Sequence, residues 1–107
     1  MSNIVDTLKH LVATGDVRIS EHGYDELAND GLTAREIVNG INEAILVEGY
    51  PNYPKGTSAL LLQKDTDGQP VHVVWGIPKG HVRPAVLVTA YRPDSTRWDT
   101  DFKKRKQ

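Results

Sequence analysis

The sequence predicts an α+β domain in which N-terminal helices pack on one face of a four-stranded antiparallel meander sheet. Apolar residues recur at helical spacing in the first part of the chain, and short apolar runs separated by turn residues follow from residue 44. The connections between those runs are too short for parallel crossovers, so neighbouring strands should run antiparallel. With 107 residues the chain forms one domain, with a core over about 3–102 and a basic tail at 103–107.

Three helices are predicted before the strands. The first covers residues 3–14, whose apolar side chains share one face. The second begins after Ser20, a favourable N-cap residue. The third begins at a capping box formed by Thr33 and Glu36. Residues 17–19 lie between the first two helices and are too few to assign, so they are read as an extended connector.

Four strands are predicted in the second part of the chain. They cover residues 44–49, 58–64, 71–77 and 85–91. Asp67 and Gly68, between the second and third strands, give the strongest hairpin signal in the chain. Strict alternation along the last strand assigns its side chains to two faces. One face would carry Ala85, Leu87, Thr89 and Tyr91, and the other would carry Val86, Val88 and Ala90.

Charge and cysteine content limit the classes of function. The formal net charge of −1 argues against a protein whose whole surface binds nucleic acid, although basic residues gather at 103–106. The chain has no cysteine, which excludes disulfides and thiolate chemistry and fits a cytoplasmic location. No apolar run approaches the roughly 20 residues of a membrane span. We therefore expect a cytoplasmic protein that makes no membrane contact.

His22 is the first candidate for chemistry. It lies in the first turn of the second predicted helix, and Glu26 follows one turn later on the same face. A carboxylate beside an imidazole orients the ring and favours its protonated form, which suits a general acid or base. The alternative is a half-buried structural histidine that bonds to Glu26 or to a strand carbonyl. Two ligands one turn apart are too few for a metal site, so we expect neither a metal nor a cofactor.

The end of the last predicted strand is the second candidate. Thr89 and Tyr91 would point to the same side, next to Arg92. A guanidinium offers a planar fork to a phosphate, and a phenol can donate a hydrogen bond or stack on a base. In the alternative interpretation, Tyr91 covers the edge of the core and Arg92 pairs with Asp94 or Asp99.

Four further features are weaker candidates. His72 lies inside a predicted strand and reads as a satisfied structural residue, whereas His81 lies in a loop that could contact a ligand. The loop Tyr50–Gly56 carries two tyrosines and a lysine, which either stack on bases or belong to a loop stiffened by proline. The basic tail at 103–106 either binds phosphates or forms a solvated, frayed end.

Several motifs resemble those of a bacterial family of domains of unknown function. They are SEHGYDEL, GY-x-x-YPKG, HVVWGIP, VLVTAYRPD and W-x-x-DFKKR, and the resemblance extends from about Asp16 to Lys106. That family has been grouped with the barnase–EndoU–colicin–RelE nuclease fold, which includes RelE-like toxins of toxin–antitoxin systems. The resemblance implies N-terminal helices packed on a four-stranded antiparallel sheet, in agreement with the pattern of the residues.

The resemblance also assigns residues. His22 matches the family's helix histidine, and Thr89 and Tyr91 match its polar pair on the final strand. Many relatives carry arginines on the histidine helix, and their absence here leaves Arg18, Arg92 and the tail as cations. This chain has at those positions Glu26, Leu27, Asn29, Asp30 and Gly31.

Three functional hypotheses follow, and they belong to different classes. The first is a metal-independent endoribonuclease or toxin-like domain that acts on RNA. In it, His22, oriented by Glu26, would act as acid or base. Arg92 would stabilise the phosphorane, and Tyr91 would position the substrate or donate a proton. The substrate-binding residues would be Arg18, Thr89, Lys103 and Arg105. The second is a non-catalytic module that binds an antitoxin-like protein, for example along a sheet edge. A small ligand between helices and sheet is a third possibility, and the oligomeric state stays open.

Overall fold

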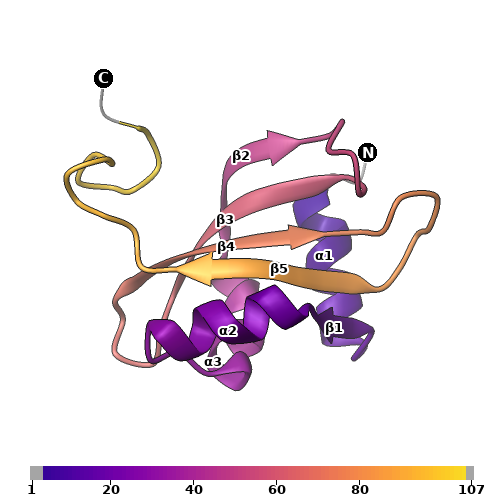
Figure 1. Ribbon diagram of the computed structural model, residues 1–107, viewed down its shortest axis with the longest axis horizontal. Coiled ribbons are helices and arrows are strands. Elements are labelled where there is room, and N and C mark those ends of the chain that lie inside the picture. The colour runs from indigo at the N-terminus through magenta and orange to yellow at the C-terminus, as the bar shows by residue number, and fades with distance from the viewer. Residues whose placement is uncertain (1–3, 106–107) are drawn as a thin grey trace.

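The fold is a mixed five-stranded sheet with three α-helices packed on one of its faces (Figure 1). The computed structural model describes residues 4–105, so residue 3 of the first predicted helix and residues 106–107 of the predicted tail lie outside the described residues. The elements are α1 (Ile4–Ala13), β1 (Val17–Ile19), α2 (Glu21–Asn29), α3 (Ala34–Gly40), a 3-10 helix (Ile41–Glu43), β2 (Ile45–Tyr50), β3 (Ser58–Lys64), β4 (Pro70–Gly76) and β5 (Ala85–Tyr91). The strand order across the sheet is β1-β5-β4-β3-β2.

The predicted antiparallel meander is confirmed, and one more strand extends it. β2, β3, β4 and β5 pair in sequence as antiparallel neighbours. β1 adds to the edge of β5 in the parallel direction, with Val17 opposite Ala85 and Ile19 opposite Leu87. The interpretation of residues 17–19 as a connector was therefore wrong, and the sheet has five strands instead of four. Three residues show no periodicity, and their pairing partner is far away in the sequence.

The helix starts follow the predicted capping residues. Ser20 has extended backbone angles, and its hydroxyl accepts a hydrogen bond from the Gly23 N–H at 2.9 Å. Thr33 and Glu36 form the complete capping box, in which each side chain accepts a hydrogen bond from the other residue's backbone N–H. These bonds satisfy N–H groups that a helix start would otherwise leave without partners.

The hydrophobic core lies between the helices and one face of the sheet. Fully buried side chains from both layers meet there, among them Leu8 of α1, Ile37 of α3 and Trp75 of β4. A buried amide joins the layers: the Trp75 indole donates to Gln63 Oε1, and Gln63 Nε2 donates to the Ile37 carbonyl, both at 2.8 Å. Burial of Gln63 is tolerated because both ends of its amide are hydrogen-bonded.

A β-bulge in β5 changes which of its side chains share a face. β4 and β5 pair Trp75 with Leu87 and Val74 with Thr89, so Val88 is an extra residue between the two pairs. Ala85, Leu87 and Ala90 consequently lie in the core. Thr89 and Tyr91 instead share the opposite face, which we call the open face. The assignment by strict alternation was wrong because it assumed a regular strand.

The segment that follows β5 covers one end of the open face. In Figure 1 it extends beyond the end of β5, away from the N-terminus. Trp98 is only 4% exposed, forms an isolated β-bridge with Arg105, and packs edge-on against the His72 ring at a centroid distance of 4.4 Å. The other end of the open face contains the cavity described next.

Candidate functional site

A cavity of about 360 Å³ lies on the open face, where β3 begins and β4 ends. We call it the sheet pocket. Its walls come from β1, the start of α2, the loop between β2 and β3, and the strands β3 to β5. The lining residues are Arg18, Ser20, His22, Tyr53, Lys55, Ser58, Gly76, Ile77, Pro78, Val86 and Val88.

The floor of the sheet pocket depends on a glycine. Gly76 is paired with Ser58 of β3 on one side and with Val86 of β5 on the other. A Cβ at position 76 would point to the open face and would approach the Ser58 hydroxyl oxygen to 2.8 Å, closer than side chains tolerate. Because residue 76 has no Cβ, the surface of the sheet is hollow between the side chains of Ser58 and Val86. The β5 bulge adds Val88 to the same wall.

Ser20 attaches the start of α2 to this wall. Its backbone N–H donates to the Leu87 carbonyl at 3.0 Å, and its hydroxyl donates to the carbonyl of the bulged residue, Val88, also at 3.0 Å. The same hydroxyl caps α2, so the helix begins where β1 ends. His22, two residues later, is thereby held at the pocket rim, and its side chain remains 66% exposed.

The polar lining of the sheet pocket is cationic. It contains the Arg18 guanidinium, the Lys55 ammonium and the His22 imidazole, and it contains no carboxylate. This is notable in a chain with 14 acidic residues and 13 lysines and arginines. Within residues 4–105 neither Arg18 nor Lys55 forms an ion pair. Two unpaired cations around one cavity can bind an anion such as a phosphate group.

Glu26 stands beside His22 but outside the pocket lining. Its Oε1 atom lies 3.8 Å from His22 Nε2, one helical turn away. This distance exceeds that of a hydrogen bond, so the two side chains are in contact without a hydrogen bond between them. The predicted pairing of His22 with Glu26 is therefore present as a contact that becomes an ion pair when the imidazole is protonated.

Tyr91 and Thr89 lie towards the other end of β5. Because of the bulge, the stretch from Val86 to Tyr91 is matched by only four residue steps on β4, from Gly76 to His72, which corresponds to about 13 Å along a strand, and Tyr91 does not line the sheet pocket. Its hydroxyl is 3.3 Å from His72 Nδ1, and burial raises the pKa of the Tyr91 phenol. Thr89 pairs with Val74 in the middle of the open face. The structure does not bring Tyr91 together with His22.

Arg92 is engaged in contacts with acidic loops. Its NH1 atom donates to Asp65 at 2.8 Å, its Nε donates to the Asp30 carbonyl at 3.3 Å, and its backbone N–H donates to the Asp30 carboxylate at 2.9 Å. The hydrogen bond with Asp65 raises the pKa of Arg92. These bonds join the end of β5 to the end of α2 and to the β3–β4 turn, so the guanidinium has a structural role here.

Arg105 and Lys103 belong to the segment that covers the open face. Arg105 donates two hydrogen bonds to Glu48, at 3.0 and 3.2 Å, and its guanidinium lies 4.6 Å from the Trp98 ring centroid. Burial and a 2.6 Å hydrogen bond to the same Glu48 raise the pKa of Tyr50 to about 12. The Lys103 backbone N–H donates to Asp99, and its side chain is exposed. Neither cation lines the sheet pocket.

Of the predicted site residues, then, the sheet pocket gathers His22 and Arg18, with Glu26 adjacent. It adds Tyr53 and Lys55, which come from the loop that the sequence marked only as a possible base-stacking segment. In the sequence, the lysine and tyrosine of that loop were the signal that could have indicated its part in the site. Its position over the sheet could not be inferred, because it depends on two backbone hydrogen bonds with the β4–β5 loop, from Lys79 N–H to the Lys55 carbonyl and from Ile77 N–H to the Thr57 carbonyl.

The described part of the chain has neither a metal-binding cluster nor a membrane-spanning helix. Residues 4–105 hold no group of three or more histidine, cysteine or acidic side chains arranged for a metal ion. None of the helices in that range has both the length and the apolar composition that a membrane crossing requires.

The fold and the cavity together define a small α+β domain with a cationic pocket on the open face of its sheet. Residues 19–92 match the family described as a domain of unknown function, DUF4258, and the chain belongs to that family. No curated protein and no solved structure gives a significant match. The matched range includes His22, Tyr53 and Lys55, and it ends before the segment that covers the open face.

Proposed function

We propose that this protein is a metal-independent endoribonuclease of the RelE-like or barnase-like, toxin-like kind, and that the sheet pocket is its active site. The observation that carries the proposal is the joint presence of His22, Arg18 and Lys55 around a cavity without carboxylates. RNA supplies its own nucleophile, the 2′-hydroxyl, so the protein needs a proton acceptor, a proton donor and cations for the phosphorane.

In the proposed reaction, the 2′-oxygen attacks the adjacent phosphorus while the bond from phosphorus to the 5′-oxygen breaks. His22 accepts the proton of the 2′-hydroxyl, and the Glu26 carboxylate lies 3.8 Å from its ring. Lys55 donates a proton to the departing 5′-oxygen, and Arg18 binds the non-bridging oxygens. The products are a 2′,3′-cyclic phosphate and a 5′-hydroxyl, and no redox partner or metal ion is needed.

The test is cleavage of a labelled single-stranded RNA in the presence of EDTA. We expect His22→Ala and Lys55→Ala to lower kcat by at least about a hundredfold, the usual size of an acid–base contribution. The matched control is His10→Ala, which removes an exposed imidazole on α1 outside the pocket and should leave cleavage unchanged. Equal loss in His10→Ala, or intact RNA at high concentrations of the wild-type protein, would contradict the proposal.

One observation favours a second candidate, a module that binds an antitoxin-like protein. β2 is an edge strand, and its first two residues, Ile45 and Leu46, are 47% and 46% exposed. An open edge with exposed apolar side chains can accept an extended segment of a partner. Absence of cleavage, together with a stoichiometric complex with the product of a neighbouring small reading frame that Leu46→Lys abolishes, would select this candidate over the nuclease.

A further inference from the structure

A second cavity adjoins the sheet pocket and differs from it in chemistry. It has a volume of about 640 Å³, within the range of small-ligand sites, and lies between the β2–β3 loop and the β4–β5 loop. We call it the loop pocket. Tyr53, Ile77 and Pro78 line both cavities, so the two cavities are immediate neighbours.

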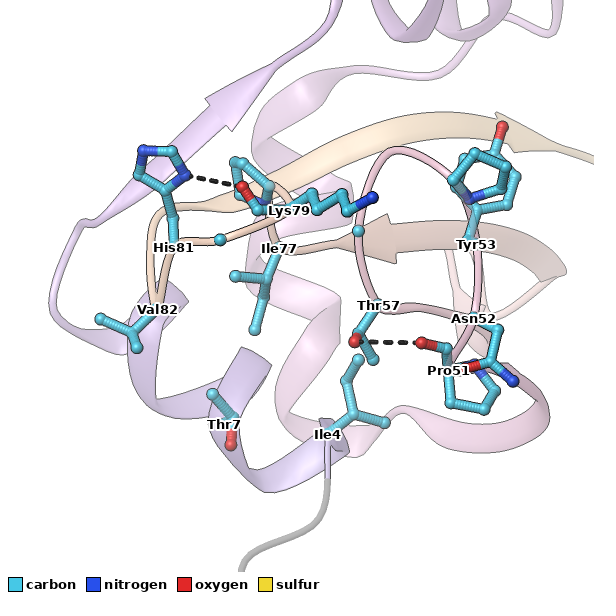
Figure 2. A pocket seen from close by; sticks show the side chains of 14 residues that line it. Ile4, Thr7, Pro51, Asn52, Tyr53, Thr57, Ile77, Lys79, His81 and Val82 are labelled. Carbon is cyan, nitrogen blue, oxygen red and sulfur yellow. Dashed lines mark hydrogen bonds between the residues drawn. The ribbon is translucent and has the colours of Figure 1, made fainter.

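The lining of the loop pocket suits a flat, uncharged group. Figure 2 shows Val82 and Thr57 on opposite sides, Ile77 between them, and Ile4 of α1 along a third side. Its apolar lining comes mainly from proline, isoleucine and valine side chains, to which Tyr53 adds an aromatic ring that is 45% exposed. Stacking on aromatic rings and apolar contact bind any nucleobase, since every base has a π-face.

Polar groups at the rim supply hydrogen bonds and positive charge. Asn52 offers both a donor and an acceptor, as the edge of a base requires. Lys79 adds an ammonium group, so the two adjoining cavities together present Arg18, Lys55 and Lys79 and no carboxylate. A base in the loop pocket would meet Asn52, and its phosphate in the sheet pocket would meet Arg18 and Lys55.

The loop pocket is held in shape before any ligand binds. A Cβ at Gly56, which has φ of +131°, would collide with the Ile77 carbonyl, so only glycine lets the two loops come this close. The Thr57 hydroxyl donates to the Pro51 carbonyl at 3.4 Å, and His81 Nδ1 bonds to the Lys79 carbonyl at 2.9 Å, as the dashed lines in Figure 2 show. A preorganised cavity loses less entropy when a base enters it.

We propose that the loop pocket is a nucleobase subsite for the residue next to the scissile phosphate, which makes single-stranded RNA the substrate class. This inference rests on the proposed cleavage in the sheet pocket. A base inside a duplex is stacked and paired and cannot enter the cavity, whereas a base in a single strand can be turned outward.

The experiment measures binding separately from cleavage. A fluorescent single-stranded 2′-O-methyl RNA heptamer, which lacks the nucleophile, and the same heptamer in a duplex are titrated by anisotropy at fixed salt. We expect at least about tenfold tighter binding of the single strand, at least about a tenfold loss in Tyr53→Ala, and little change in Tyr53→Phe, because the ring is what stacks. Val82→Asp, at a position 81% exposed, should also weaken binding.

The matched control is Tyr24→Ala, which removes another exposed tyrosine, 57% exposed, from outside both cavities. Equal affinity for single strand and duplex, with no effect of Tyr53→Ala, would overturn the base subsite even if unmodified RNA is cleaved. Tight, Tyr53-dependent binding without cleavage of unmodified RNA would keep the subsite and reject the chemistry proposed for His22. Absence of both binding and cleavage would reject both.

Discussion

His72 shows how a buried imidazole is accommodated without a role in the proposed chemistry. The residue is completely buried, and both ring nitrogens have partners: Nε2 and the Phe102 carbonyl are 2.7 Å apart, and Nδ1 and the Tyr91 hydroxyl are 3.3 Å apart. A neutral ring that donates from Nε2 and accepts at Nδ1 fits both bonds. The structural interpretation of this histidine agrees with its complete burial and its two bonded nitrogens.

The pH dependence of stability follows from this environment. Burial lowers the pKa of His72 below its usual 6.5, and the nearby Arg105 lowers it further, against the opposing effects of the Phe102 carbonyl and Glu48. The unfolded chain therefore binds a proton at a pH where the folded protein does not. By linkage, the free energy of unfolding falls as the pH drops below about 6.5 and levels off below the folded-state pKa.

We expect this fall to be smaller in His72→Gln, which can keep hydrogen bonds but cannot titrate. Urea unfolding at several pH values between about 7.5 and 5.5 measures it. His10→Gln, at an exposed position, serves as the control and should keep the wild-type slope. A fall in His72→Gln as steep as in the wild type, or steeper, would show that another group governs this pH range.

At the scale of elements, the contact between α2 and β5 sets the geometry of the proposed site. Gly23, in the first turn of α2, is buried against Leu87. A Cβ there would meet the Leu87 carbonyl oxygen at 2.8 Å and its Cδ2 atom at 3.0 Å. The helix can approach the bulged strand this closely only because residue 23 has no side chain.

Gly23→Ala should therefore destabilise the protein by about 1–3 kcal/mol, as overpacking usually does, and should displace His22 from the pocket rim. The control is Gly49→Ala in β2, where a Cβ meets no atom within 4 Å and which should leave stability unchanged or slightly raised. Denaturant unfolding measures the first effect, and the RNA cleavage assay measures the second. Equal stability of the two variants would show that α2 can shift at little cost.

Most elements were predictable because their signals are local. Capping residues marked the starts of α2 and α3, and Asp67-Gly68 marked the β3–β4 turn, in which the Gly68 N–H donates to the Asp65 carbonyl. β1 and the β5 bulge were not predictable in this way. A three-residue strand has too few residues for a period, and the bulge is defined by its register against β4 and by the Ser20 hydroxyl bonded to Val88.

At the scale of the whole molecule, the segment after β5 acts as a cover on the open face. Trp98 is its anchor, since it is almost completely buried against His72 and lies under the Arg105 guanidinium. Trp98→Ala should lower the free energy of unfolding by about 3 kcal/mol, the usual cost of removing a buried Trp side chain. Urea unfolding measures this, and the exposed Arg97→Ala is the control. A loss within about 0.5 kcal/mol, the scatter of surface substitutions, would mean that the cover contributes little.

The sequence predicted only part of the proposed site, because the rest depends on how whole elements pack against one another. His22 and the last strand were expected to meet, and β5 does pass beside α2. The strand meets the pocket through its beginning, at Val86 and Val88, whereas Tyr91 and Arg92 lie at its end. Which part of a strand approaches a helix depends on tertiary packing, and the parallel pairing of β1 with β5 decides it here.

That pairing also constrains the order of events during synthesis on the ribosome. β1 and the start of α2 have their partners at Ala85–Val88, so these early residues cannot reach their final contacts until residues 85–88 have been made. Contacts of such long sequence separation are formed late and slow the overall reaction. We therefore expect the β2–β4 meander to assemble first in a growing chain, and His22 to arrive at its pocket only when the last strand closes the sheet.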